Sequence, residues 1–283
     1  MSELQLKINS AIRILRLAEM QAKVSNQPVE LSYSGGKDSD VLLQLAKESG
    51  IFFKAFYKNT TIDPKGTLQH VRNNNVEVIQ PKFNFFEIIE KKGFPSFRFR
   101  FCCEILKEYK ILDTACWGVR ADESPKRRVR YSKGFNFCRV YNNKEKVNVF
   151  TPIADWTLSD ISFFVKDRNL QLAPVYYNND VIDFSRRLGC MGCPLKADKG
   201  IADFKKNHSL LKAYLKAGNK YFCTHYSDNK KGFNNVYELF IFRTFYHDSS
   251  LFFANNKEPT LFNFSFNAKE LLEDYFKCDL TIS

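Results

Sequence analysis

The sequence lacks any apolar stretch long enough to cross a membrane. No hydrophobic run reaches the roughly 18 residues that a spanning helix needs, although hydrophobic residues make up 44% of the chain and charged residues 26%. The first residues also lack the basic and apolar regions of a secretory signal peptide. We therefore expect a soluble cytoplasmic protein without membrane attachment, whose eight cysteines are reduced.

Histidine is scarce, and its few copies are scattered. The four histidines are His70, His208, His225 and His247. None of them stands in the spacing that a zinc protease uses, and no serine–histidine arrangement can be recognised around them. A histidine-based hydrolase or metalloprotease therefore has no support.

Acidic residues are outnumbered by basic ones. The chain has 31 Asp and Glu against 43 Lys and Arg, which gives a formal net charge of +12. Such a charge attracts polyanions, because Lys and Arg that neutralise phosphates release counterions. However, the chain is rich in Lys, Asn, Phe, Tyr and Ile together, a pattern that an AT-rich genome imposes on exposed positions whatever the function. Charge alone leaves both interpretations open.

Apolar residues alternate between helical and strand spacing along the first 170 positions. The spacing predicts strands at residues 29–33, 51–57, 76–79 and 111–119, and helices at 4–24, 40–48, 64–71, from 85 onwards and at 158–168. This alternation predicts an α/β fold with a doubly wound, mostly parallel sheet. Strand signals fade from about residue 195, and amphipathic stretches at 201–217 and 236–247 predict a helical C-terminal region.

A glycine loop separates the expected strand at 29–33 from the helix at 40–48. It consists of Ser34, Gly35, Gly36, Lys37, Asp38 and Ser39. A loop in this position aims backbone N–H groups and the positive helix end at an anion. Lys37 adds a charge for phosphates, Asp38 suits Mg²⁺, and the two serines can donate hydrogen bonds. We expect an ATP site here; the alternative is an ordinary glycine turn. The Walker pattern is excluded, because Lys37 is followed by Asp38.

Four cysteines form two local pairs, Cys102 with Cys103 and Cys190 with Cys193. The spacing of the second pair lets two thiolates reach one metal centre. A site of four thiolates can hold a 4Fe-4S cluster or zinc, although adjacent cysteines are uncommon in zinc sites. Free or redox-active thiols are the third interpretation. Cys116 lies in an apolar strand and is expected to be buried and unreactive.

Basic side chains crowd a segment that we expect to be a loop. They are Arg120, Lys126, Arg127, Arg128, Arg130 and Lys133. Guanidinium groups bind phosphate or sulfate through paired hydrogen bonds, but a run of charge by itself is more often a solvated face. Trp156 and the aromatic run from Phe240 to Phe253 can stack on bases or pack a core.

Several motifs in order resemble one known family. The glycine loop looks like the PP-loop of ATP pyrophosphatases, which cleave ATP between the α- and β-phosphates. The further motifs are Asn59 to Asp63, Phe94-Pro95 with Arg98 and Arg100, Gly118 to Ser124, Pro152 to Thr157 with Asp160-Ile161, and Gly189 to Pro194. Together they resemble the phosphoadenosine phosphosulfate reductase family in its broad sense, over roughly residues 28–195.

This resemblance implies a HUP-like fold and assigns roles to several residues. The nucleotide-binding α/β domain with its cysteine cluster would cover residues 1–195, and the helical region residues 196–283. Lys37, Asp38 and Arg120 would be catalytic, and the rest of the glycine loop would bind the nucleotide. Arg128 would face the substrate phosphates together with Arg120, whereas Arg127 and Arg130 stay unassigned. Some sulfonucleotide reductases and DNA phosphorothioation enzymes bind a 4Fe-4S cluster through such cysteines, which favours the cluster over zinc.

Three functions remain in competition. The leading one is an ATP pyrophosphatase that adenylylates an acceptor, so that sulfur can then replace AMP. We expect the acceptor to be nucleic acid, and the sulfur donor can be a protein. The second is reduction of adenylyl sulfate or its 3′-phosphate to sulfite. Those reductases carry a degenerate phosphate loop and a Glu-Cys-Gly motif, whereas here the loop is intact and Cys278 lies in Phe-Lys-Cys-Asp. The third is a non-catalytic regulator that binds nucleotide or DNA.

Overall fold

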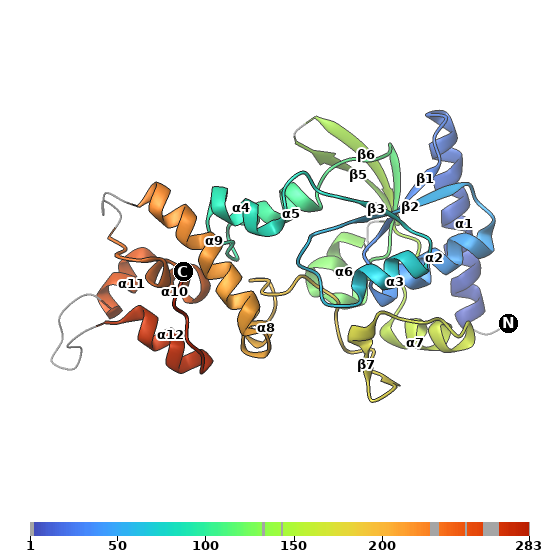
Figure 1. Ribbon diagram of the computed structural model, residues 1–283. Helices are drawn as coiled ribbons and strands as arrows, with labels where there is room; N and C mark the ends of the chain where they lie inside the picture. The colour runs from blue at the N-terminus through green and yellow to red at the C-terminus, as the bar shows by residue number, and fades with distance from the viewer. Residues whose placement is uncertain are drawn as a thin grey trace. The chain divides into compact units, whose positions relative to one another are not determined.

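The computed structural model describes residues 3–131, 134–142, 144–226, 232–246, 248–256 and 266–282 (Figure 1). The chain forms two compact units. The first comprises residues 1–59, 63–81 and 106–189, and the second comprises residues 60–62, 82–105 and 190–283. The domain boundary expected near residue 195 stays a prediction; the second unit takes in residues 60–62 and 82–105 as well as those from Cys190 onwards.

The first unit is built on a six-stranded sheet in the order β3-β2-β1-β4-β6-β5. Its strands are β1 (Val29–Tyr33), β2 (Phe53–Lys58), β3 (Glu77–Ile79), β4 (Thr114–Trp117), β5 (Asn136–Tyr141) and β6 (Glu145–Phe150). All neighbouring pairs are parallel except β5 with β6, which is antiparallel. This arrangement confirms the predicted mostly parallel α/β sheet.

Helices flank this sheet in the first unit (Figure 1). They are α1 (Glu3–Val24), α2 (Lys37–Ser49), α3 (Thr67–Asn73), α6 (Pro125–Tyr131) and α7 (Leu158–Asp167), with short 3₁₀ turns η1 (Ala121–Glu123) and η2 (Pro174–Tyr176). Buried side chains of α1, α2 and α7 share one core with β1, including Leu15, Leu31, Leu45 and Phe164. Gly50 ends α2 in the left-handed conformation that glycine adopts at low cost. The start of α2 is therefore anchored to the middle of the sheet.

Two features of this unit differ from the prediction. The stretch from Lys126 to Arg130 was expected to be a loop, but it lies in helix α6. Pro125 opens that helix without losing a needed N–H, and the N–H of Arg128 donates to the carbonyl of Ser124 at 3.0 Å. The β5–β6 hairpin was not predicted, because exposed polar residues occupy half of β6 and only Val147, Val149 and its last residue are buried.

The second unit is helical in its described parts. It contains α4 (Phe85–Lys92), most of α5 (Phe101–Leu106), α8 (Ile201–Lys206), α9 (His208–His225), α10 (Val236–Phe245), α11 (Ser249–Asn256) and α12 (Ala268–Phe276). The predicted helical C-terminal region is therefore confirmed. The short strands β7 (Tyr177–Asn178) and β8 (Val181–Ile182) belong to the first unit.

Aromatic rings form the core that ties residues 82–105 to the C-terminal helices. Phe94 packs against Tyr214 of α9 and Phe240 of α10, with ring centroids 6.3 and 5.3 Å apart. Gly218 of α9 makes room for Phe94, because a Cβ at this position would lie 2.0 Å from the ring. This packing explains why the segment before the first cysteine pair clusters with the C-terminal helices.

No helix among the described residues has both the length and the apolar character that a membrane span requires.

Candidate functional site

The glycine loop joins β1 to the first turn of α2. Gly35 has a positive φ of 75°, and Gly36 is the N-cap residue of α2 without a side-chain cap. Ser34 Oγ donates to Ser39 Oγ at 3.2 Å, and Ser39 Oγ donates to the carbonyl of Gly36 at 2.7 Å. The loop is therefore closed by its own hydroxyl groups, next to the positive end of a helix of 13 residues.

Neighbouring backbone packs closely on this first turn. A Cβ at Gly118, just after β4, would lie 2.8 Å from the carbonyl oxygen of Asp38. The hydroxyl of buried Tyr176 accepts hydrogen bonds from the N–H of Lys37 at 3.2 Å and from that of Leu188 at 3.4 Å. Tyr176 belongs to η2, and this role was not predicted from the sequence. The turn is thus fixed from two sides.

Lys37, Asp38 and Arg120 lie in contact at this turn. The Nε of Arg120 donates to Oδ1 of Asp38 at 2.6 Å, and Nζ of Lys37 lies 3.6 Å from Oδ2. Arg120 and Lys37 are each only 4% exposed. Burial lowers the pKa of Lys37, Asp38 opposes this shift, and the positive charges of Arg120 and Arg187 lower the pKa further. Two buried cations therefore share one carboxylate, an arrangement suited to a polyanion.

Two more arginines join this cluster through Glu123. Arg187 donates to Oε1 of Glu123 at 2.7 Å, and Arg127 pairs with Oε2 of the same carboxylate. The pKa of Arg127 is lowered mainly by burial; the charges of Arg187 and Arg120 lower it further, while Tyr131 and Asp38 act in the opposite direction. The cations of the cluster are Lys37, Arg120, Arg127 and Arg187, and its carboxylates are Asp38, Asp122 and Glu123. Arg187 was missed; its only sequence signal is the Arg-Arg pair before the second cysteine motif.

The other predicted basic residues lie elsewhere on the first unit. Arg128 lines a separate hollow of about 390 Å³ together with Ser10 and Asp155. Lys126 and Arg130 line another hollow beside β5. This hollow does not include the glycine loop, so the role of Arg128 toward phosphates stays a prediction. Lys133 lies outside the described residues, as does His247.

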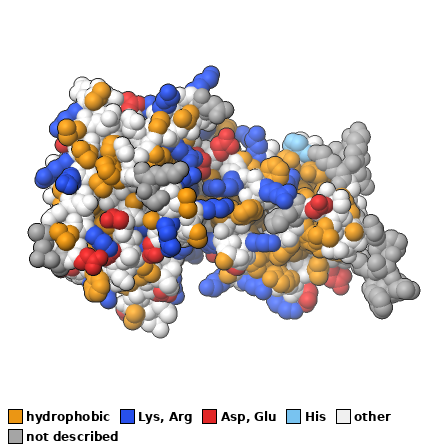
Figure 2. All heavy atoms as spheres, turned by 180° about the vertical axis from the view of Figure 1, so that it is seen from behind, with side chains coloured by type: hydrophobic (Ala, Val, Ile, Leu, Met, Phe, Trp, Pro, Cys, Tyr) orange, Lys and Arg blue, Asp and Glu red, His pale blue; other side chains and the backbone are white. Residues whose placement is uncertain are grey.

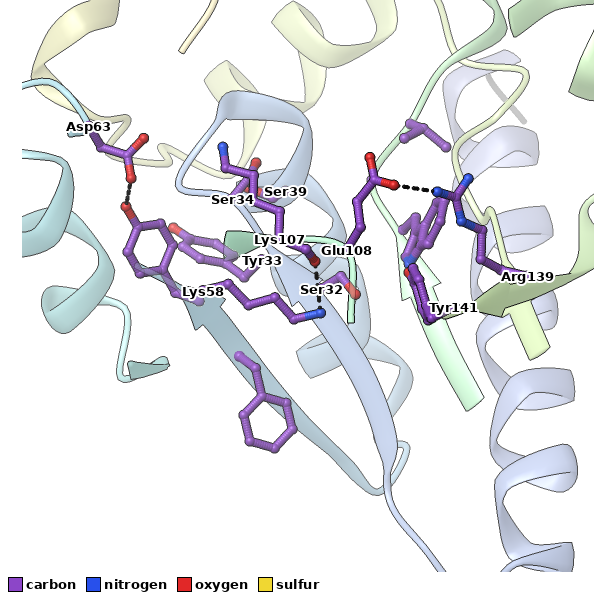
Figure 3. Close-up of a pocket in the computed structure, with 15 residues that line it drawn as sticks. Ser32, Tyr33, Ser34, Ser39, Lys58, Asp63, Lys107, Glu108, Arg139 and Tyr141 are labelled. Carbon is purple, nitrogen blue, oxygen red and sulfur yellow. Dashed lines mark hydrogen bonds and ion pairs between the residues drawn. The ribbon is translucent and has the colours of Figure 1, made fainter. Parts of the chain in front are cut away.

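A pocket of about 320 Å³ lies at the ends of the central strands, beside the glycine loop (Figure 3). We call it the strand-end pocket. Its walls include the aromatic side chains of Tyr33, Phe56, Tyr57, Trp117 and Tyr141. Ligands of open α/β sheets bind at the carboxyl ends of the parallel strands, and the volume suits a small molecule.

Polar groups line the mouth of the strand-end pocket. Lys58 Nζ donates to the carbonyl of Lys107 at 3.1 Å, a bond that Figure 3 shows crossing the strand ends. Glu108 pairs with Arg139 at 2.8 Å. The pKa of Lys58 is lowered by burial, against the raising effect of Glu30. Apart from the serines of the glycine loop, the sequence had not assigned these lining residues to the nucleotide site, because they come from four different strands.

A buried polar group supports the first turn of α2 from below. Asp40 is 5% exposed, and its carboxylate oxygens lie 2.9 and 3.1 Å from Nε2 of His70 and accept from the hydroxyl of Tyr33. Burial raises the pKa of Asp40, while the bonds from His70 and Tyr33 lower it. His70 therefore acts as a structural partner of the loop.

The four predicted cysteines all belong to the second unit. Cys102 and Cys103 lie in α5, whereas Cys190 and Cys193 lie in the loop before α8. The pKa of the Cys102 thiol is raised by its hydrogen bond with Cys103, then by burial, and by the charges of Cys103, Cys190 and Cys193. The Cys190 thiol donates to Thr60 Oγ1 at 3.6 Å. The two pairs are thus close enough for their charges to interact, and all four thiols are half-buried.

A donor set of four thiols without histidine suits a soft, thiolate-bound centre such as an iron–sulfur cluster or zinc. Within the described parts of the chain, however, no group of three or more His, Cys, Asp or Glu side chains is arranged to hold a metal ion. The loop itself is closely packed, since a Cβ at Gly192 would lie 2.7 Å from Phe204. The four thiols therefore fit an iron–sulfur cluster or zinc by their chemistry, and the cysteine side chains must turn to ligate it.

Of the aromatic residues considered for base stacking, Trp156, Phe240 and Phe252 are core residues, whereas Phe245 is 37% exposed. Trp156 and Phe252 are 0% exposed and Phe240 is 1% exposed. They pack edge-to-face on other aromatic rings, such as Trp156 on Phe164 and Phe240 on Phe94. Their surfaces are therefore closed to any ligand.

Comparison with solved structures yields several of similar arrangement. A phosphoadenylyl-sulfate reductase from Candida auris is 14% identical with a TM-score of 0.45, and the match covers 67% of this chain and 96% of that chain. A U34-tRNA thiolase from Methanococcus maripaludis with its 4Fe-4S cluster is 17% identical with a TM-score of 0.40, over 77% of this chain and 79% of that chain.

The chain also matches curated proteins and a family. It is 28% identical over 199 residues to an uncharacterised protein of Methanocaldococcus jannaschii, which covers 65% of this chain and 46% of that protein. It is 29% identical over 133 residues to an uncharacterised 37.8 kDa protein of Escherichia phage 186, over 42% and 37% of the two chains. The chain spans less than half the length of these relatives.

The model of the phosphoadenosine phosphosulfate reductase domain matches residues 28–196, which include the glycine loop and both cysteine pairs. The chain therefore belongs to the phosphoadenosine phosphosulfate reductase domain family, as its motifs predicted.

Proposed function

We propose that the protein is an ATP pyrophosphatase that adenylylates an acceptor, nucleic acid, for sulfur transfer. One observation carries this proposal: buried Lys37 and Arg120 converge on Asp38 at the first turn of α2, next to an intact glycine loop. An ordinary glycine turn has no need for this cluster, in which four cations face the three carboxylates of Asp38, Asp122 and Glu123. The remaining positive charge costs desolvation energy unless a bound anion compensates it.

The triphosphate of ATP would lie at the glycine loop, and its adenosine in the strand-end pocket. Lys37 and Arg120 would neutralise the phosphate oxygens, and Arg127 and Arg187 would extend this positive field toward the leaving group. A Mg²⁺ ion held by Asp38 would neutralise phosphate charge. The aromatic walls of the pocket, such as Tyr57 and Trp117, offer faces for a purine ring.

The proposed chemistry has two steps. An oxygen of the acceptor forms a bond to the α-phosphorus while the bond to the bridging oxygen breaks, and pyrophosphate leaves with the electron pair. A sulfide-level nucleophile from a donor then forms a bond to the acceptor atom as AMP leaves with the oxygen. The cation cluster around Asp38 stabilises the charge that develops on the departing pyrophosphate.

The four cysteines of the second unit are assigned to a 4Fe-4S cluster in this proposal, with zinc as the alternative. Cys102, Cys103, Cys190 and Cys193 would hold it as thiolates. A bound cluster would supply a soft metal site for sulfide. The half-buried thiols, the hydrogen bond to Thr60 and the close packing at Gly192 keep this region partly shielded from water.

Reduction of a sulfonucleotide is the competing function, and it needs a nucleophilic thiol. Cys278 is the candidate by position, but burial raises the pKa of its thiol, against the lowering effect of Lys212. A thiol with a raised pKa has less of the reactive thiolate at neutral pH. This observation favours the pyrophosphatase.

The test is release of pyrophosphate from ATP and Mg²⁺ in the presence of candidate RNA or DNA. We expect release by the unaltered protein and a loss of at least about 100-fold in Asp38→Ala, because an oriented charged group at the phosphates is removed. Asp167→Ala, which alters an exposed carboxylate at the end of α7, serves as the matched control and should retain activity. Equal release by the protein and the Asp38 variant would contradict the proposal, and sulfite formed from adenylyl sulfate with a thiol would favour the reductase.

A further inference from the structure

A short turn before the first cysteine pair exposes two large aromatic side chains. Phe97 is 62% exposed and Phe99 is 57% exposed. Arg98 and Arg100, which alternate with them, are exposed as well. We call residues 97–100 the Phe-Arg turn. Large exposed apolar groups close together in the chain often mark a binding surface.

The Phe-Arg turn is held in place from both ends. The backbone groups of Ser96 and Phe99 exchange two hydrogen bonds of 3.2 Å, and Ser96 Oγ accepts from the N–H of Phe99 at 3.3 Å. Just before the turn, Phe94 is buried in the aromatic core against Gly218. The backbone that carries the exposed side chains is therefore fixed, which reduces the entropy lost when a ligand binds.

The charge of the segment fits a polyanion. Residues 91–103 contain four basic side chains and no acidic one. Arg243 of α10 adds a further guanidinium, which lies 5.1 Å from the centre of the Phe99 ring. Lys and Arg outnumber Asp and Glu in the chain as a whole, and Figure 2 shows their side chains spread over the face that it displays. Aromatic rings next to guanidinium groups are the combination that binds bases and phosphates together.

We propose that the Phe-Arg turn binds single-stranded nucleic acid, with Phe97 and Phe99 stacking on bases and Arg98, Arg100 and Arg243 contacting phosphates. Single strands are specified because bases within a duplex are stacked on one another and do not reach a protein ring. A membrane surface fits less well, because the Phe99 ring already carries a guanidinium that would have to be desolvated among acyl chains. Naming the strand as the acceptor rests on the proposed function.

The position of the turn gives the bound strand a role. Within the second unit, the turn leads directly into α5, where Cys102 and Cys103 lie. A strand that stacks on Phe97 and Phe99 is therefore held beside the cysteines assigned to sulfur chemistry. This surface was missed from sequence, because Phe and Arg residues at these positions are indistinguishable from core and solvated residues without the exposed fractions.

The test is equilibrium binding of fluorescein-labelled 20-nucleotide single strands to the full chain, followed by anisotropy without ATP. RNA and DNA of the same sequence are compared with the matching duplex. We expect the single strands to bind, and Phe97→Ala and Phe99→Ala each to weaken binding by about tenfold, since one stacked base is lost with each ring. Phe163→Ala removes an equally exposed ring from α7 of the other unit and should leave binding unchanged.

Arg98→Ala should lower the slope of log Kd against log salt concentration by about one, because one phosphate contact is lost. Arg98→Lys should retain most of that slope. Each variant changes an exposed side chain, and circular dichroism checks that it remains folded. The proposal is overturned if both Phe variants bind the strands as tightly as the unaltered protein, or if duplex and single strand bind equally. It is also overturned if the Phe variants lose binding to phosphatidylserine vesicles but keep their binding to nucleic acid.

Pyrophosphate release separates this inference from the proposed function. If the Phe variants lose strand binding while no variant or strand ever supports pyrophosphate release, the surface stands and the proposed reaction fails. If pyrophosphate is released in the presence of nucleic acid and the Phe variants bind the strand as tightly as the unaltered protein, the reaction stands and the Phe-Arg turn fails as the binding surface.

Discussion

Asp38 is the residue on which the two buried cations of the first unit meet. Arg120 reaches it at 2.6 Å and also contacts Asp122 at 3.0 Å, so its guanidinium is fixed by two carboxylates. Lys37 approaches the other oxygen of Asp38 and donates to the carbonyl of Arg186 at 3.3 Å. Because both cations are buried, their charges are poorly screened by solvent and act strongly on a bound phosphate.

Arg120→Ala is expected to reduce pyrophosphate release by about 100- to 1,000-fold, since a preorganised donor is removed from the charge that develops in the reaction. Arg120→Lys should recover only part of this loss, because an ammonium cannot bridge Asp38 and Asp122 as a planar guanidinium does. Arg16→Ala, on the exposed side of α1, is the control. Steady-state kinetics measure all three, and a fully active Arg120→Ala variant would remove Arg120 from the site.

Cys278 provides a second prediction at this scale. Its raised pKa means that less thiolate is present at a given pH, so alkylation by iodoacetamide at neutral pH should be slower than at an ordinary thiol. The rate should increase as the pH rises toward and beyond the usual thiol pKa. Mass spectrometry of peptides compares it with the exposed Cys138 and Cys223. Faster modification of Cys278 than of these two would instead support a reductase.

At the scale of elements, the site depends on how closely β4 and α2 approach. The backbone after β4 passes so near the first turn of α2 that only a residue without a side chain fits at Gly118. This approach places Arg120, two residues later, against Asp38. Gly118 is therefore required for packing and does not need a positive φ.

Gly118→Ala is expected to destabilise the protein by about 1–3 kcal/mol, because the added methyl group must displace the carbonyl of Asp38. ATP affinity should fall at least tenfold, since the first turn of α2 moves. Gly189→Ala is the matched control in the same unit, where an added Cβ meets no atom within 4 Å. Thermal denaturation and nucleotide titration measure both effects. Equal stability and equal ATP affinity of the two variants would show that the backbone after β4 can move away from α2 without loss of stability.

Elements also show where sequence patterns were sufficient. The strand at 29–33 was predicted with its observed bounds, because its apolar residues lie between Pro28 and the glycine loop. The helix α6 was not predicted, since four of its seven residues are Lys or Arg and it has no buried face. Neither hydrophobic periodicity nor charge can distinguish such a helix from a loop; its start is set by Ser124 and Pro125.

At the scale of the whole molecule, the nucleotide residues and the cysteines belong to different compact units. The glycine loop and Arg120 lie in the first, and all four cysteines of the two pairs lie in the second. Each unit has its own core, one built on the sheet and one of aromatic rings. We therefore expect that substitutions can remove the nucleotide site or the cysteine site without unfolding the other unit.

Anaerobic purification is expected to give a brown protein that contains iron and acid-labile sulfide. Cys190→Ser should lose most of the iron and lower the thermal stability of the second unit, because metal binding is coupled to folding. Cys138→Ser changes an exposed cysteine of the first unit and should retain both. Elemental analysis decides the outcome, and colourless protein with stoichiometric zinc would contradict the cluster.

The sequence by itself determined the features that depend on neighbouring residues. Hydrophobic spacing fixed the alternation of strands and helices, and the glycine loop and the cysteine pairs are each contained within a few residues. Tertiary packing decided which distant groups meet: Arg127 and Arg187 at Glu123, four strands and several loops around the strand-end pocket, and residues 82–105 with the C-terminal helices. It also decided that Trp156 is closed to ligands while Phe97 and Phe99 are open. The reason is physical: spacing along a chain records local periodicity, whereas exposure and contact between elements arise only when their surfaces pack together.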